Sequence, residues 1–592
     1  MTPPPPPIWI VDTECYPNYW LCMFRHATTG ELRWWEADGD MFDLRVMFER
    51  HCTIGFNSKH YDMPMIAAAL AGATCAQLKD VNDAIILRGM KPWDIEREYG
   101  YTVPQGWDHV DLFDVAPGVA TSLKMYGGRM HSKRLRDLPF DPNVPLTPAQ
   151  IVELREYCGN DLITTVDMYN KLQPQLELRA VMGTEYGLDL RSKSDAQIAE
   201  AVIRQEVQNK LGYRIYRPEL DQNYSFHYKV PSFVQFEAPG LQHMLSIVRS
   251  ALFTLDSKGA VEMPTSLDSM RIRIGRGVYR MGLGGLHSTE ANISERVTQG
   301  WRIVDRDVTS YYPTIILTQE LFPAHMGRAF LEVYRKLVDD RIEAKRAGQK
   351  VKADALKICV NGSFGKLGSP WSVLYSPDLL IAVTLTGQLA LLMLIEMIDG
   401  LDIDVVSANT DGVVSMVSYD RRAEFEAVIA WWECITGFVT EETEYVALYS
   451  KDVNNYIAIK PDGTTKLKGS YATAGMQKNP ANEVCVDAVI AYLTTGKPIA
   501  DTLRECTDVR KFLTIRNVKG GGMYDGQYLG RAVRWYYAVG ETRHIAYATN
   551  GKKVARSEGC RPLMELPDAV PADVNLRWYW DEAMSILGDI GL

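Results

Sequence analysis

The feature that most constrains the fold is an apolar stretch in the middle of the chain, LLIAVTLTGQLALLMLIEMI (379–398). Its length would allow a helix to cross a membrane. However, Thr384, Thr386, Gln388 and Glu396 interrupt it. Polar side chains at these positions favour a helix buried inside a large domain. The rest of the chain therefore has to supply a core that encloses this helix.

The chain length and composition are compatible with such a core. A chain of 592 residues is too long for one hydrophobic core and predicts about two to four domains. The formal net charge of -10 argues against a mainly basic nucleic-acid coat, but it allows a local basic groove. The ten cysteines include no CxxC pair, so we expect reduced thiols, no structural zinc and a cytoplasmic protein. The opening MTPPPPPIWIV reads as a polyproline lead-in and not as a signal peptide.

The first third of the chain has the pattern of an α/β domain. Residues 8–185 alternate β-rich runs with helical patterns, and residues 151–172 form a long amphipathic helix pattern. Residues 186–300 are harder to interpret. They contain a helix pattern near 194–210 and a probable hairpin with a glycine cluster, RIRIGRGVYRMGLGGLHS. We therefore expect an α/β multidomain protein.

Two candidate acidic positions lie about a hundred residues apart in the second half of the chain. The strand pattern WRIVDRDVTSYYPTIIL carries Asp305 and Asp307 at its end, and SANTDGVVSMV places Asp411 at the tip of a hairpin. Two divalent ions that clamp attacking and leaving oxygens need carboxylates held on rigid elements. Each aspartate taken alone is a common turn or capping residue.

A cationic helical pair lies between these acids. YRKLVDDRIEAKRAGQKVKADALKICVNGSFG predicts two helices that break at AGQ. Folding them back on each other sets Arg341 opposite Lys357, with Lys345 one turn away. Lys357, Asn361 and Phe364 share one face of the second helix. Three cations and an aromatic ring suit a nucleoside triphosphate. A solvated cationic face would explain the charges, but it would not explain why Asn361 lies on the same helix face as Lys357.

These segments resemble the three ordered motifs of family B DNA polymerases. DVTSYYP resembles motif A (DxxSLYP), KICVNGSFG resembles motif B (KxxxNSxYG), and NTDG stands where motif C (DTDS) is expected. The size is similar to that of the small bacteriophage-type members. The resemblance implies palm, fingers and thumb domains and a polymerase site with two Mg²⁺ or Mn²⁺ ions. Its metal ligands would be Asp307, Asp411 and the carbonyl of Val308. The residues that bind the dNTP would be Tyr312, Arg341, Lys345, Lys357, Asn361 and Phe364.

The chain departs from these motifs at several positions. Phe364 replaces the usual tyrosine, Gly362 replaces serine and Tyr311 replaces leucine. Asn409 replaces the first aspartate of motif C, which in this family is often peripheral. We therefore expect altered metal affinity and a working site. A site inactivated by the missing acid is the alternative.

A later segment resembles the one that grips the primer terminus in this family, where the pattern is KxY. Here the pattern is Asn454, Asn455 and Tyr456, and Lys468 stands nearby as a substitute charge. We expect Tyr456 and Lys468 to contact DNA. The tail GQYLGRAVRWYYA interleaves arginines with aromatic residues, and it suits either a thumb that grips the DNA backbone or a packed amphipathic strand.

Acids in the first third of the chain resemble those of DEDD proofreading 3′–5′ exonucleases of the tyrosine subtype, which have a ribonuclease-H-like fold. The set is Asp12, Glu14, Asp62 and Asp161, with Tyr157 one helical turn before Asp161. The resemblance implies a second site with two metal ions, held by Asp12, Glu14 and Asp161. It also implies contacts to a frayed single strand from Asn57, Tyr61, Ser122 and Leu123.

The resemblance divides the chain into successive segments. These are 1–185 (exonuclease), 186–300 (connecting region), 301–330 (palm, motif A), 331–366 (fingers), 367–480 (palm, motif C) and 481–592 (thumb).

Together these features predict a DNA-templated DNA polymerase with proofreading, located in the host cytoplasm if it is viral. We expect primer-template DNA and dNTPs as partners, a monomer, and no membrane association. Only 50 residues separate Asp307 from Lys357, which leaves little room for the insertion of protein-primed relatives, so we expect no terminal protein. The alternatives are an exonuclease with an inactive, DNA-binding polymerase half, and a non-catalytic replisome scaffold.

Overall fold

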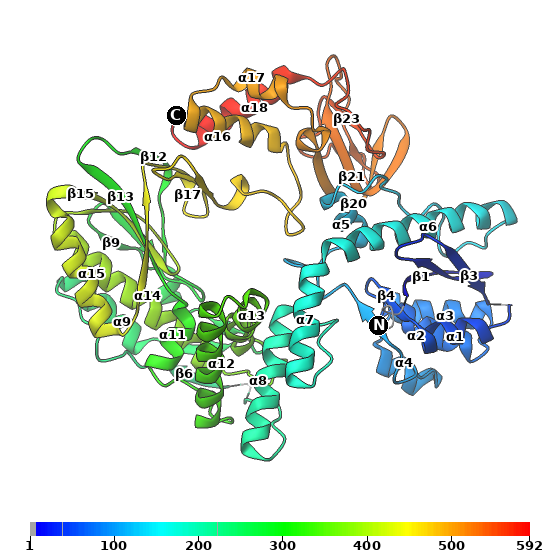
Figure 1. Cartoon of the computed structure of the whole chain (residues 1–592), viewed down its shortest axis with the longest axis horizontal. Coiled ribbons are helices and arrows are strands. Elements are labelled where there is room, and N and C mark those ends of the chain that lie inside the picture. The colour runs from blue at the N-terminus through cyan, green and yellow to red at the C-terminus, as the bar shows by residue number, and fades with distance from the viewer. Residues whose placement is uncertain (1–6, 38, 222) are drawn as a thin grey trace.

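A five-stranded sheet organises the N-terminal lobe (residues 8–171) of the computed structural model, which describes residues 7–37, 39–221 and 223–592 (Figure 1). Most of the proline-rich lead-in, residues 1–6, lies outside the described residues. The strand order is β3 (Leu32–Glu36), β2 (Tyr19–His26), β1 (Ile8–Tyr16), β4 (Cys52–Gly55) and β5 (His109–Asp111).

Helices cover both faces of this sheet, and a separate apolar cluster lies on each face. The helices are α1 (Phe42–Arg50), α2 (Asp62–Leu70), α3 (Cys75–Ile86), α4 (Pro92–Tyr99), α5 (Leu123–Arg129) and α6 (Pro148–Lys171). Helix α6 begins where the sequence dictates. Thr147 and Gln150 form a reciprocal capping box, and Pro148 fits the first turn because it has no N–H to leave unpaired.

The central part of the chain is built on a seven-stranded sheet. Its order is β16 (Thr440–Tyr445), β13 (Trp301–Val308), β15 (Gly412–Ser418), β14 (Asp404–Asn409), β11 (His287–Ser288), β10 (Gly277–Arg280) and β9 (Ile272–Ile274). The hairpin expected in the glycine-rich segment is formed by β9 and β10, which pair antiparallel. The segment 272–288 therefore belongs to the same sheet as Asp307 and Asp411.

Helices pack against the sheet and extend from it (Figure 1). They are α7 (Gln173–Tyr186), α8 (Asp195–Leu211), α9 (Pro239–Ser250), α11 (Tyr311–Thr318), α12 (Arg328–Arg346), α13 (Lys350–Leu367), α14 (Pro377–Asp399) and α15 (Arg422–Thr436). The predicted break at AGQ lies between α12 and α13. A small sheet of β6 (Ser225–His227), β7 (Leu252–Leu255) and β8 (Val261–Glu262) lies beside α9 in the chain.

The apolar stretch that constrained the fold forms α14, at the centre of the largest apolar cluster. It is long and apolar enough to cross a membrane, but 83% of its most apolar window is buried inside the protein. Its polar side chains have partners there. Gln388 binds the backbone of Gly282 and Gly284, and Thr386 contacts the hydroxyl of Tyr228. Glu396, near its end, accepts bonds from the backbone of residues 237–238. The expectation of a buried helix holds.

Two further sheets complete the chain. One has the order β12 (Ala291–Arg296), β17 (Ala447–Asp452), β18 (Asn455–Ile459) and β19 (Thr465–Leu467). The other lies in the C-terminal lobe (residues 483–592), with the order β22 (Ala546–Tyr547), β20 (Thr514–Tyr524), β21 (Gln527–Tyr537) and β23 (Cys560–Pro562). Helices α16 (Glu483–Thr495), α17 (Ile499–Glu505) and α18 (Leu576–Asp589) pack beside that sheet.

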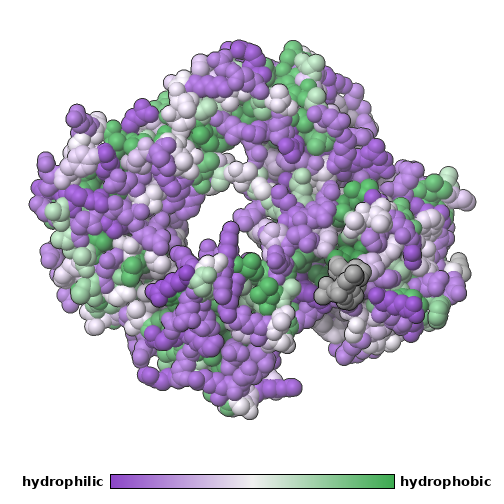
Figure 2. Space-filling view, in the orientation of Figure 1, coloured by the Kyte–Doolittle hydropathy of each residue, from purple (hydrophilic) through white to green (hydrophobic). Residues whose placement is uncertain are grey.

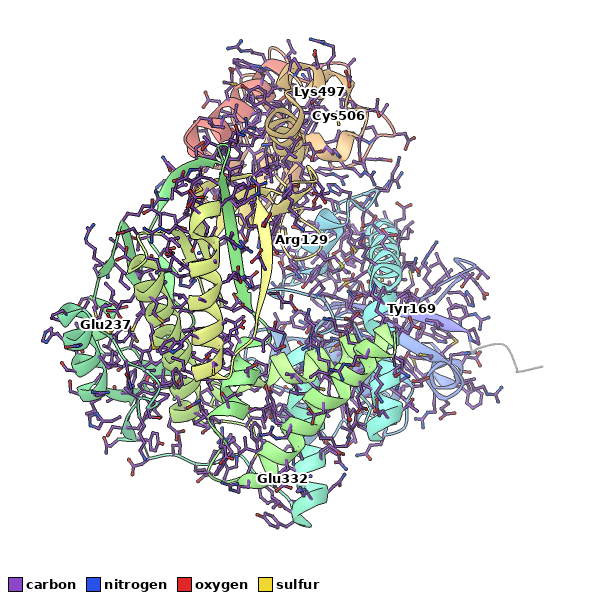
Figure 3. The ribbon with its side chains drawn as sticks, turned by 60° about the vertical axis from the view of Figure 1, so that its left-hand side comes forward. Arg129, Tyr169, Glu237, Glu332, Lys497 and Cys506 are labelled. Atoms are coloured by element: carbon purple, nitrogen blue, oxygen red, sulfur yellow. The ribbon has the colours of Figure 1, made fainter. Side chains whose placement is uncertain are left out.

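The C-terminal lobe returns to the N-terminal lobe, so the molecule forms a ring with an opening in its middle (Figures 1 and 2). Arg129, which Figure 3 labels, bridges toward the segment that precedes this lobe. It donates to Asn479 Oδ1 at 2.8 Å and to the carbonyl of Met476 at 2.9 Å. Backbone bonds from Leu135 to Met564 and from Leu566 to Lys133 join the two lobes directly.

Arg534 of β21 lies at the centre of this junction. It is fully buried, and its guanidinium donates to four carbonyls, those of Leu563, Ser132, Met564 and Lys133, at 2.7 to 3.3 Å. Burial lowers its pKa to about 10. Arg534 therefore fits the packed-strand interpretation of GQYLGRAVRWYYA, because it faces the protein interior and cannot grip DNA, whereas Arg531 of the same strand is exposed.

We predict that Arg534→Met weakens the junction strongly. The substitution removes the donor that these four carbonyls share, which costs about 2–4 kcal/mol. Denaturant unfolding measures the loss as a lower midpoint. Arg531→Met is the matched control, because this exposed residue of the same strand contacts the N-terminal lobe through its backbone N–H. Equal midpoints for both variants would contradict the assigned role.

Candidate active sites

The first site lies where β13 meets the turn between β14 and β15. Asp307 pairs with Gly412 across the antiparallel strands, which sets its carboxylate next to the turn that carries Asp411. The N–H of Val308 donates to the carbonyl of Asp411 at 2.7 Å. Thr410 has a φ of 55°, in the left-handed region, and this sharp turn ends the strand and presents Asp411.

The structure brings every predicted residue of the triphosphate site into one cavity with these acids. The cavity has a volume of about 500 Å³, within the usual range for small-molecule sites. Its predicted lining residues are Asp307, Val308, Asp411, Tyr312, Arg341, Lys345, Lys357, Asn361 and Phe364. They come from β13, α11, α12, α13 and the β14–β15 turn, so distant segments meet here.

Contacts inside this cavity fix its aromatic and cationic walls. Tyr312 and Phe364 stack with their ring centroids 4.1 Å apart. Arg341 donates to Ser310 Oγ at 3.0 Å and so ties α12 to the turn after β13. Tyr311, which stands where the family has leucine, points instead into the core and donates to the carbonyl of Gly387 at 2.6 Å. A Cβ at Gly387 would lie 3.0 Å from that ring, so glycine allows the approach.

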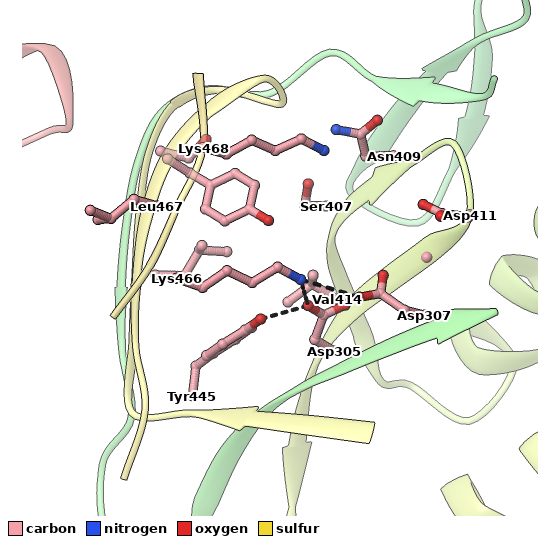
Figure 4. Close-up of a pocket in the computed structure, with 14 residues that line it drawn as sticks. Asp305, Asp307, Ser407, Asn409, Asp411, Val414, Tyr445, Lys466, Leu467 and Lys468 are labelled. Atoms are coloured by element: carbon pink, nitrogen blue, oxygen red, sulfur yellow. Dashed lines mark hydrogen bonds and ion pairs between the residues drawn. The ribbon is translucent and has the colours of Figure 1, made fainter. Parts of the chain in front are cut away.

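A second, smaller cavity also has Asp307 and Asp411 in its lining (Figure 4). Lys466 and Lys468 reach into it from β19 and the residue after it. Tyr456 lines it too, with the ammonium of Lys468 5.9 Å from the centre of its ring. The predicted primer-terminus residues Tyr456 and Lys468 therefore share a cavity with the acids. No pattern in the sequence indicated Lys466.

Asn409 has a structural task at this turn. Its amide nitrogen donates to the carbonyl of Val453 at 3.0 Å, and its amide oxygen accepts from Thr410 Oγ at 3.0 Å. A carboxylate could accept the second bond but could not donate the first. Asparagine at 409 therefore connects the Asp411 turn to the loop between β17 and β18.

The glycine cluster at 282–286 supports the same turn from the opposite side. The N–H of Thr410 donates to the carbonyl of Leu286 at 2.7 Å. A Cβ at Gly285 would lie 2.6 Å from the Cα of Thr410, so only glycine allows this close approach. Gln388 of α14 holds Gly282 by bonds to its N–H and carbonyl. The buried helix therefore positions the loop that positions Asp411.

The electrostatics of the first site favour a bound cation. Burial, followed by the charge of Asp307, raises the pKa of Asp411. The same two causes raise the pKa of Asp305, which is buried. Mg²⁺ and Mn²⁺ prefer oxygen ligands such as carboxylates. A divalent ion would also relieve the repulsion between these neighbouring carboxylates. Asp307 and Asp411 therefore fit a divalent metal ion.

The second site collects the acids of the N-terminal lobe. Asp12 and Glu14 project to the same side of β1, as their spacing predicts, and the ligand atoms of Asp12, Glu14 and Cys158 lie within 4.8 Å of one another. Thr13 donates to Asp62 Oδ1 at 2.5 Å. Burial, then Asp62, Glu14 and Asp161, raise the pKa of Asp12.

Glu14 and Asp62 of this second site are perturbed in the same direction as Asp12. The pKa of Glu14 rises to about 8 and that of Asp62 to about 7, chiefly through burial. Burial also raises the pKa of the Cys158 thiol well above its usual value, and this buried thiol lies beside Asp12 and Glu14. The four predicted acids therefore form one electrostatic cluster that fits a divalent ion.

Lys124 of α5 is the cation of this cluster, and the sequence interpretation missed it. Its ammonium lies 3.0 Å from Asp161 Oδ2 and also donates to the hydroxyl of Tyr157. Tyr157 and Asp161 are neighbours on α6, one turn apart, and both are buried. Lys124 directly follows the predicted residues Ser122 and Leu123, which was the available signal.

The four residues predicted to contact a single strand have roles within the fold. Ser122 caps α5 by accepting from the N–H of Met125 at 3.3 Å, and Leu123 packs against the apolar cluster beside α6. Tyr61 donates to Asn82 Oδ1 at 2.7 Å. Asn57 has a φ of 57°, in the left-handed region that asparagine adopts more readily than most residues.

No family model matches the sequence, and no curated protein matches it. Among solved structures, the chain is similar to the family B DNA polymerase from the hyperthermophilic archaeon Pyrobaculum calidifontis. The two are 16% identical, with a TM-score of 0.41, and the alignment covers 99% of this chain and 78% of that one.

We predict that Asn409→Asp does not improve the first site, although it recreates the usual family residue. The new carboxylate would face the carbonyl of Val453 without a proton to donate, which costs about 1–3 kcal/mol. Denaturant unfolding measures this loss. The control is Asn454→Asp, at an exposed position of the loop between β17 and β18. An Asn409→Asp variant as stable as the parent would contradict this role.

We predict that Glu14→Gln stabilises the metal-free protein. An acid whose folded pKa is raised destabilises the fold at any pH above its unfolded pKa, and this penalty disappears below that pH. At pH 8 with a chelator, Glu14→Gln should gain about 1–2 kcal/mol. Added Mg²⁺ should stabilise the parent more than the variant. Thermal unfolding measures the stability with chelator and the stabilisation by Mg²⁺. The control Glu153→Gln, at an exposed position, should change neither quantity.

Proposed function

We propose that the protein is a DNA-templated DNA polymerase that extends a nucleic-acid primer with dNTPs and proofreads with a 3′–5′ exonuclease. One observation carries the proposal. The six residues expected at the triphosphate, from three helices, line a single cavity with Asp307 and Asp411. A surface cluster of solvated lysines would not converge on two acids and a stacked aromatic pair.

The cations of the cavity would bind the triphosphate of the incoming nucleotide. Arg341, Lys345 and Lys357 supply three positive charges from the facing helices α12 and α13. Phosphate oxygens accept charge-assisted hydrogen bonds from such groups, and guanidinium can bind two oxygens at once. Asn361 lies one turn after Lys357 on the same helix, where it would line the pocket of the nascent base pair.

The stacked rings would position the nucleoside. Tyr312 lies against Phe364, so the two form a flat wall next to Asp411. A ring under the sugar leaves no room for a 2′-hydroxyl, which favours dNTPs. Phe364 keeps the stacking face of the usual tyrosine and lacks only the hydroxyl.

Asp307, Asp411 and the carbonyl of Val308 would hold two Mg²⁺ or Mn²⁺ ions. Such ions, when bound, bring the attacking and leaving oxygens together and stabilise the charge that develops at phosphorus. The chain itself orients the reactants. The primer 3′-hydroxyl would lie on the side of Tyr456 and Lys468, the triphosphate on the opposite side, and the α-phosphate between them.

The cluster of Asp12, Glu14, Asp62 and Asp161 would be the exonuclease site. Asp12, Glu14 and Asp161 would hold two ions, and Tyr157 would position the water that attacks the terminal phosphodiester. Lys124 holds both Tyr157 and Asp161 and so fixes the distance between them. A 3′ single strand is the substrate class.

A small bacteriophage-type member of family B with a nucleic-acid primer fits this geometry. Helices α11, α12 and α13 occupy most of the chain from residue 311 to residue 367. This segment therefore holds no additional domain that could accommodate a protein primer.

Primer extension tests the proposal on a recessed, 5′-labelled primer with Mg²⁺, with and without dNTPs. We expect Asp411→Asn to lose nucleotide addition by at least about a hundredfold and to keep primer shortening. Asp12→Asn should lose primer shortening and keep nucleotide addition. Asp420→Asn, an exposed position, is the control for both activities.

The outcome separates the alternatives. Shortening without growth in the parent and in every variant with an intact Asp12 would show an exonuclease on an inactive polymerase half. Neither activity in the parent, with DNA binding retained, would favour a non-catalytic scaffold.

A further inference from the structure

Asp305 and Asp307 project to the same side of β13, yet they have different surroundings. Asp305 is almost completely buried, whereas the Asp307 side chain is 45% exposed. Asp305 Oδ2 accepts from the hydroxyl of Tyr445 at 2.7 Å and from Lys466 Nζ at 3.0 Å (Figure 4). Asp305 lines the smaller cavity and is absent from the lining of the triphosphate cavity. It therefore anchors Lys466.

Lys466 joins the buried acid to the exposed one. Its ammonium also lies 3.1 Å from Asp307 Oδ2. The other oxygen of Asp307, Oδ1, lies against Gly412, where an added Cβ would collide with it. The two oxygens of this carboxylate thus have separate environments. One is held by a lysine, and the other lies against the glycine that directly follows Asp411.

We propose that Lys466, anchored by Asp305 and Tyr445, is a positioning residue that fixes the Asp307 carboxylate and competes with the divalent ion for its Oδ2. The inference rests on the proposed function, because it assigns Asp307 to the metal ions. Asp305 is then the acid that retains the lysine in the site, and not a third metal ligand.

The sign of the effect on metal binding follows from the charges. An ammonium in contact with a metal-binding carboxylate repels a divalent ion and occupies one of its donor oxygens. Removing the ammonium should therefore tighten metal binding, even though Asp307 loses its fixed orientation. Removing the anchor should do the opposite, because Lys466 then binds Asp307 alone and the site has one negative charge fewer.

The test measures Mn²⁺ binding without DNA or nucleotide, by electron paramagnetic resonance of the free ion. All proteins carry Asp12→Ala and Glu14→Ala, so that the second site does not contribute. Lys466→Gln keeps a donor for Asp305, and Lys466→Met does not. We expect either to tighten Mn²⁺ binding roughly tenfold and Asp305→Asn to weaken it. Lys460→Met, at the residue directly after the neighbouring strand β18, should leave it unchanged.

A purely structural lysine would give another result. Lys466→Gln and Asp305→Asn would then change Mn²⁺ affinity in the same direction or not at all, and the proposal would be wrong. Unfolding midpoints identify variants that fail to fold, and Lys466→Gln remains informative if Lys466→Met does not fold. Primer extension by the parent reports separately on the proposed function, so the two hypotheses can fail independently.

Discussion

Carboxylates that repel one another at short range are the constraint on which both sites depend. The strands β1 and β13 each place two acids on one side, because side chains two residues apart on a strand point the same way. Burial then raises the pKa of several of these acids and makes the clusters costly without a cation. In each site a lysine from another element neutralises part of the negative charge. This lysine is Lys124 in the N-terminal lobe and Lys466 in the central one. The same arrangement makes both clusters suitable for divalent ions.

The support behind each acid is as specific as the acid itself. Asp411 sits on a turn held by Asn409 on one side and by the loop at Gly285 on the other, and that loop is held by Gln388 of the buried helix. The polar residues that argued against a membrane span therefore have a task. They connect the core of the largest apolar cluster to the turn that carries Asp411, so the packing of α14 influences the geometry of a residue it does not touch.

The sequence predicted what depends on local spacing. The break between α12 and α13, the shared face of Lys357 and Phe364, the β14–β15 hairpin and the buried α14 all follow from periodicity and turn chemistry, and the structure has each of them. Lys466 was not predictable in this way, because its contacts join strands about 160 residues apart. The amide bond of Asn409 to Val453 was hidden for the same reason. The pattern around Arg534 fitted two interpretations, and only the packing of β21 distinguishes them.

The junction at Arg534 limits how far the lobes are separable modules. In the N-terminal lobe, the carbonyl of Ser132 accepts from Arg534, about 400 residues later, and that of Lys133 accepts from Arg534 and from the N–H of Leu566. A fragment that ends before β20 would leave these groups, and the apolar contact of Met125 with Ile515, without their partners. The two ends of the chain thus form one cooperative unit, in which an insertion or a domain exchange at either end is felt at the other.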